Sequence, residues 1–542
     1  MKNCNHSWRY VAGLTAVLGL AALTAMPSNR PNKTVRSMAS SCIISEPGGR
    51  PVTENNDPLA KLLLAADPCP ANVFELRSRI LAAGGRIKTT LVANRGFHNA
   101  KSLGDFPYFS MFEIVSGRLE SIKADVAEGD FFFGHFTGTD GAKTIFADQR
   151  TQSGSLMIEA IAFDSSKQVF NFYELLGTGR SGQWFYRGDS TDILADVKLL
   201  HRQPNPARPQ FGGRLRCSGC HTAGGPIMKE IEAPHNDWWR TERPVPFGVL
   251  KPDAALSAVL KGLVDANQLS DAAKAGLKKI EASEKFQKAK RTLSLQEQLR
   301  PLFCPVELNL DSDPMPLDQG DANIQVPSAF FIHPMLARGT VTIERAHYEA
   351  ALKQVKTKLP ETSRADADHA WLTPVKAFSD TLAIESLIKQ GVIDEEFAID
   401  ILAVDLTNPV FSDSRCKLLL MLPDKAEGGW KEVFKAKLAA SSDPAAQELL
   451  KNLTDPRRNA QFHRARAASV LTACQSNLKN KDVVIKMFSL LAQRRAEAGA
   501  SEISKNPKGQ ILEPGFRVIF PVTPGAKPRQ FKLTEDGMVT PR

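Results

Sequence analysis

Residues 76–205 combine short apolar or aromatic runs with closely spaced turn signals. The runs are Tyr108–Ile114, Asp130–Phe133, Leu156–Phe163, Val169–Leu175 and Gln183–Tyr186. Gly-Asp, Asp-Ser-Ser and Gly-Thr-Gly steps separate them. Runs rich in β-branched and aromatic residues, interrupted in this way, are typical of strands. We therefore expect an antiparallel sheet in this region.

The pattern changes to helical spacing after residue 206. Apolar residues within 256–263 recur at i, i+3, i+4 and i+7 after Pro252, which suits the first turn of a helix. Three further pairs of residues predict helix starts: Ser294 with Glu297 as a capping box, and Thr373-Pro374 and Asp443-Pro444 as an N-cap followed by proline. Helices are expected to dominate from 346 to 505.

These sequence patterns predict an α+β multidomain protein. It has a strand-rich N-terminal region, a helical segment after residue 206, and a mainly α-helical C-terminal region. The expected divisions are a signal peptide or signal anchor at 1–26, a linker and short helix at 27–75, the strand-rich domain at 76–205, a second domain at 206–345, the helical domain at 346–505, and a strand and turn tail at 506–542.

The N-terminus has the pattern of an export signal. Lys2 and Arg9 precede the mostly apolar run Val11–Met26, and turn-forming residues follow. The run is long, so an uncleaved signal anchor is an alternative. Because no later stretch is long and apolar enough to span a bilayer, we expect membrane contact only through this segment. The expected location is the bacterial periplasm.

Composition narrows the classes of function. Of the 542 residues, 42% are hydrophobic and 24% are charged, as in ordinary globular proteins. The net charge of +10 is spread along the chain, without a Lys/Arg tract interleaved with aromatics. We therefore expect no nucleic-acid binding. The sequence contains no P-loop, Rossmann fingerprint or nucleophile elbow, and it identifies no catalytic residues.

The segment Cys217-Ser218-Gly219-Cys220-His221 contains Cys-x-x-Cys-His, the attachment signature of c-type haem. Two thiols at this spacing each add to one vinyl group of the porphyrin, and the adjacent imidazole ligates the iron. With 8 Cys and 10 His in the chain, random placement gives roughly 0.002 such matches. A zinc site would need two more ligands at suitable spacing, and a thioredoxin-like pair would need a βαβ context. We expect one covalent haem c.

On these residues the chain resembles the cytochrome c superfamily over 206–345, and the resemblance implies that this segment is a helical, cytochrome c-like haem domain. In class I members a Gly-Pro follows the haem histidine, and the proline carbonyl accepts the imidazole Nδ1–H. Gly225-Pro226 looks like that element, so the resemblance implies that Pro226 orients His221.

Several residues are candidates for the distal side of the haem. The superfamily usually supplies a methionine from a later loop, and Met315 and Met335 are loop-borne. His235 lies close to Trp238 and Trp239, which are suited to lining a haem pocket. The alternative is an open sixth coordination position on the iron. An open position binds small ligands, whereas a closed one is typical of simple electron transfer.

The remaining cysteines suggest disulfides in an oxidising compartment. Their spacing makes Cys42–Cys69 and Cys416–Cys474 plausible local bridges and leaves Cys304 as a free thiol.

Three functions fit this sequence. The first is electron transfer through the haem to a redox partner protein. The second is a haem enzyme or gas-binding protein with an open distal site, because a strand-rich region ahead of the motif resembles the order found in the cytochrome P460 and c′-beta group. Ala162-Phe163-Asp164 and Trp184-Phe185-Tyr186 carry this resemblance, and His98 and His135 are candidate pocket residues. The third is a scaffold protein stapled by haem.

Overall fold

The structure is a computed structural model of one chain. It describes residues 42–46, 49–93, 109–136, 155–177, 181–196, 221, 223–226, 262–264, 267–304, 308–311, 322–355, 373–376, 378–409, 412–426, 428–487, 489 and 531–541. All of them belong to one unit, Ser41–Arg542. The proposed signal segment, both motif cysteines and His235 lie outside the described residues.

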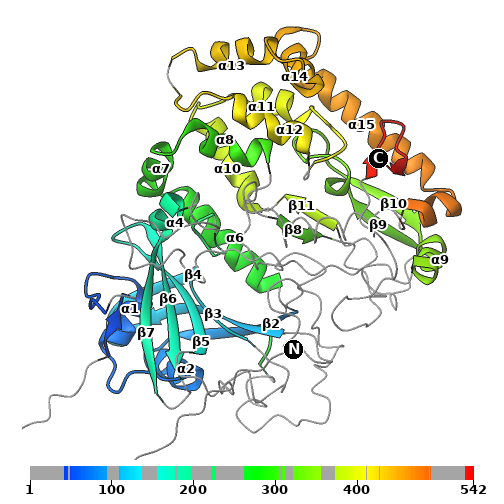
Figure 1. Cartoon of the computed structure of the whole chain (residues 1–542). Coiled ribbons are helices and arrows are strands. Elements are labelled where there is room, and N and C mark those ends of the chain that lie inside the picture. The colour runs from blue at the N-terminus through cyan, green and yellow to red at the C-terminus, as the bar shows by residue number, and fades with distance from the viewer. Residues whose placement is uncertain are drawn as a thin grey trace, which may run out of the picture. The chain divides into compact units, whose positions relative to one another are not determined.

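A seven-stranded sheet forms the strand-rich region, in the order β1-β7-β6-β5-β4-β3-β2 (Figure 1). The strands are β1 (Ile44–Ser45), β2 (Arg86–Ala93), β3 (Phe109–Leu119), β4 (Ala124–Phe136), β5 (Ser155–Asp164), β6 (Val169–Gly177) and β7 (Gly182–Asp189). Strands β2 to β7 pair antiparallel with their neighbours, and β1 joins the edge parallel to β7. The expected antiparallel sheet is thus confirmed.

Both faces of the sheet are buried, because its side chains alternate between two hydrophobic cores. Phe131 and Phe133 face one core, whereas Phe132 between them faces the other. Helices α1 (Pro58–Leu64) and α2 (Val73–Ala82) contribute to the first core. The second core contains residues of α4 (Ser190–Asp196), α6 (Asn267–Glu281) and α7 (Glu284–Arg291).

One row of side chains crosses the second face from strand to strand. Register pairs Ile114 with Phe132, Phe132 with Ile161, and Ile161 with Phe172. All four side chains are buried in the core beneath α6. Cross-strand apolar pairs of this kind stabilise a sheet and pin its register. The row ends at Phe172 on β6, which contacts the functional site described below.

The C-terminal region is mainly helical, as expected, and shares one large core. Its helices are α8 (Leu295–Phe303), α9 (Arg345–Val355), α10 (Phe378–Lys389), α11 (Glu395–Leu402), α12 (Asp413–Leu418), α13 (Trp430–Ala439), α14 (Pro444–Thr454) and α15 (Ala460–Asn477). Three short ribbons accompany them: β8 (Leu308–Asp311) with β11 (Thr373–Lys376), β9 (Asn323–Pro327) with β10 (Thr340–Glu344), and β12 (Phe531–Leu533) with β13 (Val539–Pro541).

Two of the three predicted helix starts are confirmed, and one is wrong. Ser294 and Asp443 are N-caps whose side chains accept backbone N–H groups, as predicted. Thr373-Pro374 is wrong as a helix start, because it forms strand β11 and the next helix begins at Phe378. A two-stranded ribbon tolerates Pro374, since a strand with a free edge does not need every N–H. Leu263, the last residue of the predicted helix 252–263, instead forms a parallel bridge with Thr89 of β2.

The disulfides follow the prediction in part. Cys42–Cys69 is confirmed. Cys416–Cys474 is wrong, because Cys416 is bonded to Cys304, and Cys474 is the free cysteine among the described residues. Cys474 lies on the buried side of α15, where its Sγ is 3.6 Å from the carbonyl oxygen of Gly537. Sequence proximity therefore selected the wrong partner for Cys416.

A buried polar network fixes α1 to the sheet. Asp57 caps α1 by accepting the backbone N–H of Ala60 at 2.9 Å. The same carboxyl group accepts hydrogen bonds from the Tyr173 hydroxyl and, at 2.8 Å, from Asn171 Nδ2. Burial raises the pKa of Asp57, and these donors oppose that rise.

In the described part of the chain, no helix combines the length and apolar character that a bilayer span requires.

We expect Tyr173→Phe to lower the free energy of unfolding by about 1–3 kcal/mol, because a buried carboxyl group loses a donor. Urea denaturation followed by circular dichroism measures the change. Tyr186→Phe is the comparison, since the Tyr186 hydroxyl lies 3.4 Å from a neutral amide oxygen of Asn171. Equal losses in the two variants would contradict this view of the network.

We expect the Cys474 thiol to resist iodoacetamide in the native protein. It is buried, and burial, with a smaller contribution from Asp536, raises its pKa to about 12. After denaturation without reduction, Cys474 should become alkylated, and peptide mass spectrometry should recover Cys42–Cys69 and Cys304–Cys416. A peptide that joins Cys416 to Cys474 would refute this connectivity.

Candidate functional site

The His221 side chain is oriented by a backbone carbonyl four residues further on. Its Nδ1 lies 2.8 Å from the carbonyl oxygen of Gly225. Since a carbonyl oxygen only accepts, Nδ1 carries the proton in this contact. In the neutral ring, Nε2 then carries the lone pair that a metal would take.

The surroundings of His221 favour this neutral form. Burial lowers the pKa of His221 to about 4, and the hydrogen bond with Gly225 opposes the shift only in part. The imidazole is therefore uncharged at neutral pH, as a metal ligand must be.

The expected role of Pro226 is corrected in one respect. The carbonyl that accepts the Nδ1–H belongs to Gly225, not to Pro226. Pro226 instead packs its ring against α6 at Gly276. Gly225 of the Gly-Pro pair thus orients His221, and Pro226 packs the turn against α6.

We call His221 together with Ala223–Pro226 the histidine turn. Its first anchor is Gly224, whose φ of +74° lies in the left-handed region and favours glycine. A Cβ at this position would lie 2.8 Å from the Phe286 ring of α7 and 3.3 Å from Cβ of Ser190. The backbone of the turn is therefore packed directly against α7 and α4.

A second anchor joins the turn to α6 and β4. Any side chain at Gly276 would meet the ring of Pro226 and would lie 2.7 Å from the carbonyl oxygen of Gly129 in β4. A Cβ at Gly225 would similarly lie close to Leu277 on the same helix. Helix, strand and turn thus meet at a point where only glycine fits.

The sheet supplies the third contact. The rings of Phe172 and His221 have centroids 5.5 Å apart and planes inclined at 52°. Phe172 is the last residue of the cross-strand row, so the histidine lies at the edge of the second sheet core. Phe172, Ser190 and Gly276 were not identified from the sequence as site residues.

These residues fit a haem-ligand role. A porphyrin already gives iron four nitrogen ligands, so one neutral histidine with a fixed tautomer provides what the protein must add on one face. Across the described ranges, no cluster of three or more His, Cys, Asp or Glu side chains could hold a metal ion by itself. Cys217 and Cys220, the predicted thioether residues, come just before His221 in the sequence but lie outside the described residues, so their role stays a prediction.

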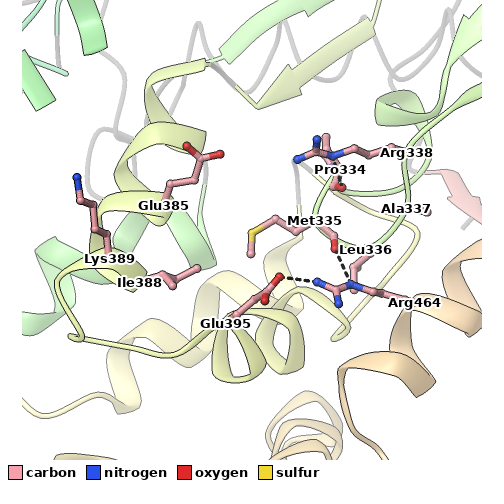
Figure 2. A pocket seen from close by; sticks show the side chains of 10 residues that line it. All are labelled: Pro334, Met335, Leu336, Ala337, Arg338, Glu385, Ile388, Lys389, Glu395 and Arg464. Carbon is pink, nitrogen blue, oxygen red and sulfur yellow. Dashed lines mark hydrogen bonds and ion pairs between the residues drawn. The ribbon is translucent and has the colours of Figure 1, made fainter. Parts of the chain in front are cut away.

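The distal candidates are placed only in part. His235, Met315 and His98 lie outside the described residues, and His135 belongs to β4, opposite Met111 of β3. Met335 lines a pocket of about 540 Å³ in the helical region (Figure 2). The pocket is bordered by Pro334, Met335, Leu336, Ala337, Arg338, Glu385, Ile388, Lys389, Glu395 and Arg464.

The contacts of Met335 belong to the helical core. Its backbone N–H donates to His333 Nδ1 at 3.2 Å. Its carbonyl oxygen accepts Arg464 Nε at 3.4 Å, and the same guanidinium pairs with Glu395 at 2.5 Å (Figure 2). His221 is not among the residues that line this pocket, so the structure does not bring Met335 and His221 together there.

Comparison with known protein families, curated proteins and solved structures finds no match for this chain.

We expect Gly224→Ala to destabilise the protein more than Gly391→Ala. Both glycines have a positive φ, +74° and +69°, so each alanine strains the backbone by about 1–2 kcal/mol. Gly391 has open space around it, whereas Gly224 faces Phe286 and Ser190. The crowding at Gly224 should add roughly 1–3 kcal/mol. Urea denaturation of both variants tests this, and equal losses would show that the histidine turn is not tightly packed.

Proposed function

We propose that this chain is an exported c-type haem protein. Cys217 and Cys220 would form the thioether bonds, and Nε2 of His221 would ligate the iron. The observation that carries the proposal is the short contact between His221 Nδ1 and the Gly225 carbonyl, directly after the Cys-x-x-Cys pair. The haem, when bound, supplies an iron centre for one-electron chemistry.

The chain's own residues would prepare the ligand. The Gly225 carbonyl holds the proton on Nδ1, which selects the tautomer and strengthens Nε2 as a donor. The adjacent Phe172 ring covers part of the imidazole. Burial keeps the ring neutral by lowering its pKa to about 4, so iron need not compete with a proton near pH 7.

Electron transfer to a redox partner protein is the first function that we propose for the haem. Export to the periplasm is part of the proposal. The two disulfides support an oxidising compartment, since such bonds are rare in reducing ones.

A haem enzyme or gas-binding protein is the second candidate. The contact between Phe172 and His221 favours it, because the sheet itself then borders the haem ligand. A simple electron carrier needs only a small domain, and here a seven-stranded sheet is part of the site.

Expression of the full chain in a periplasm with c-type maturation enzymes tests the proposal. We expect haem staining on a denaturing gel, and loss of most staining in Cys217→Ala and Cys220→Ala. Cys474→Ala is the control, because that thiol lies in the helical core, and it should keep full staining. Absence of haem from the unaltered chain would overturn the proposal.

Visible spectra of the reduced protein separate the two functions. A sharp α-band that carbon monoxide leaves unchanged would indicate a closed haem and electron transfer. Ready uptake of carbon monoxide would instead support the haem enzyme or gas-binding protein.

A further inference from the structure

Ser190, the first residue of α4, forms a buried link to the histidine turn. Its side chain is fully buried, and its Oγ lies 2.6 Å from the carbonyl oxygen of Gly224 and 2.9 Å from the backbone nitrogen of Phe170. The Phe170 N–H donates to Oγ. The hydroxyl has two acceptors, the carbonyl oxygens of Gly224 at 2.6 Å and of Phe170 at 3.4 Å, and the shorter distance favours Gly224. This serine therefore ties strand β6 to the turn through a single side chain.

The bond acts on the peptide next to the one that holds His221. The Gly224 carbonyl accepts from Ser190, and the following carbonyl, that of Gly225, accepts from His221 Nδ1. Successive peptide units share one α-carbon, so a shift of the Gly224 carbonyl also displaces the Gly225 peptide. Two glycines in a row would otherwise give this backbone wide freedom.

We propose that Ser190 is a positioning residue for His221 and that it thereby sets the redox potential of the haem. The inference rests on the proposed function. A strong Nδ1–H···O=C bond gives the imidazole more anionic character, which makes it a better donor to iron. A better donor stabilises the oxidised iron more than the reduced iron, and so it lowers the potential.

Phe172 supports the same arrangement from the sheet. Its ring, 5.5 Å from that of His221, limits how far the imidazole turns when the Gly225 carbonyl shifts. Loss of the Ser190 hydroxyl should therefore weaken the Nδ1 hydrogen bond without releasing the histidine. The expected change is one of donor strength rather than of ligand identity.

The test compares Ser190→Ala with Ser412→Ala in the haem-loaded full chain. Ser412 is also buried at a helix start, accepts the Arg415 N–H at 3.1 Å and donates to Asp405 at 2.7 Å, and both of these partners belong to the helical region. We expect Ser190→Ala to retain covalent haem and to shift the midpoint potential to more positive values. Ser412→Ala should keep the unaltered potential.

A second variant retains a side chain at position 190 and weakens its hydrogen bonds. Ser190→Cys replaces the hydroxyl with a thiol, which is a weak donor and a weak acceptor, so it should also shift the potential to more positive values. This variant tests the inference if Ser190→Ala does not fold. An unchanged potential in every variant that folds with haem would overturn the inference. A chain that binds no haem at all would instead overturn the proposed function.

Discussion

A strand and a helix touch backbone to backbone only where side chains are missing, and Gly276 of α6 and Gly129 of β4 supply those positions. Glycine inside a helix costs about 1 kcal/mol relative to alanine. Here the cost is offset by contact with Pro226 on one element and with Gly129 on another. The position of His221 depends on this meeting point, because Pro226 ends the turn that carries the imidazole. The sheet, its helical cover and the histidine therefore form one structure.

Much of the fold could be predicted from the sequence. Apolar and aromatic runs between turn signals marked the sheet, and residues such as Ser294 and Asp443 marked helix starts, because these signals are local. Errors arose where long-range packing decides. Thr373-Pro374 has the local chemistry of a helix start, yet pairing with β8 makes it a strand. Cys416 joins Cys304, which is 112 residues away, rather than the nearer Cys474, because core packing brings α8 beside α12.

The residues of the site also fall into those that the sequence reveals and those that only the structure reveals. Cys217, Cys220 and His221 are visible as a motif because attachment chemistry requires a fixed spacing. Gly225-Pro226 was also visible, although only the structure assigns the acceptor to Gly225. Ser190 and Phe172 carry no local signal, since they reach the histidine through the pairing of β6 with β7 and the start of α4. Gly276 offered one weak clue, a residue unfavourable in an otherwise good helix.

The order of these elements along the chain has a consequence for maturation. All strands of the sheet precede His221, but α6 and α7, which supply Gly276 and Phe286, follow it. If the chain is exported from its N-terminus, as the proposed function has it, the motif emerges before α6 and α7. Under the proposed function, the attachment machinery would meet an accessible segment, and later folding of α6 and α7 would enclose it. The turn can be enclosed only after the chain up to Arg291, the end of α7, has emerged.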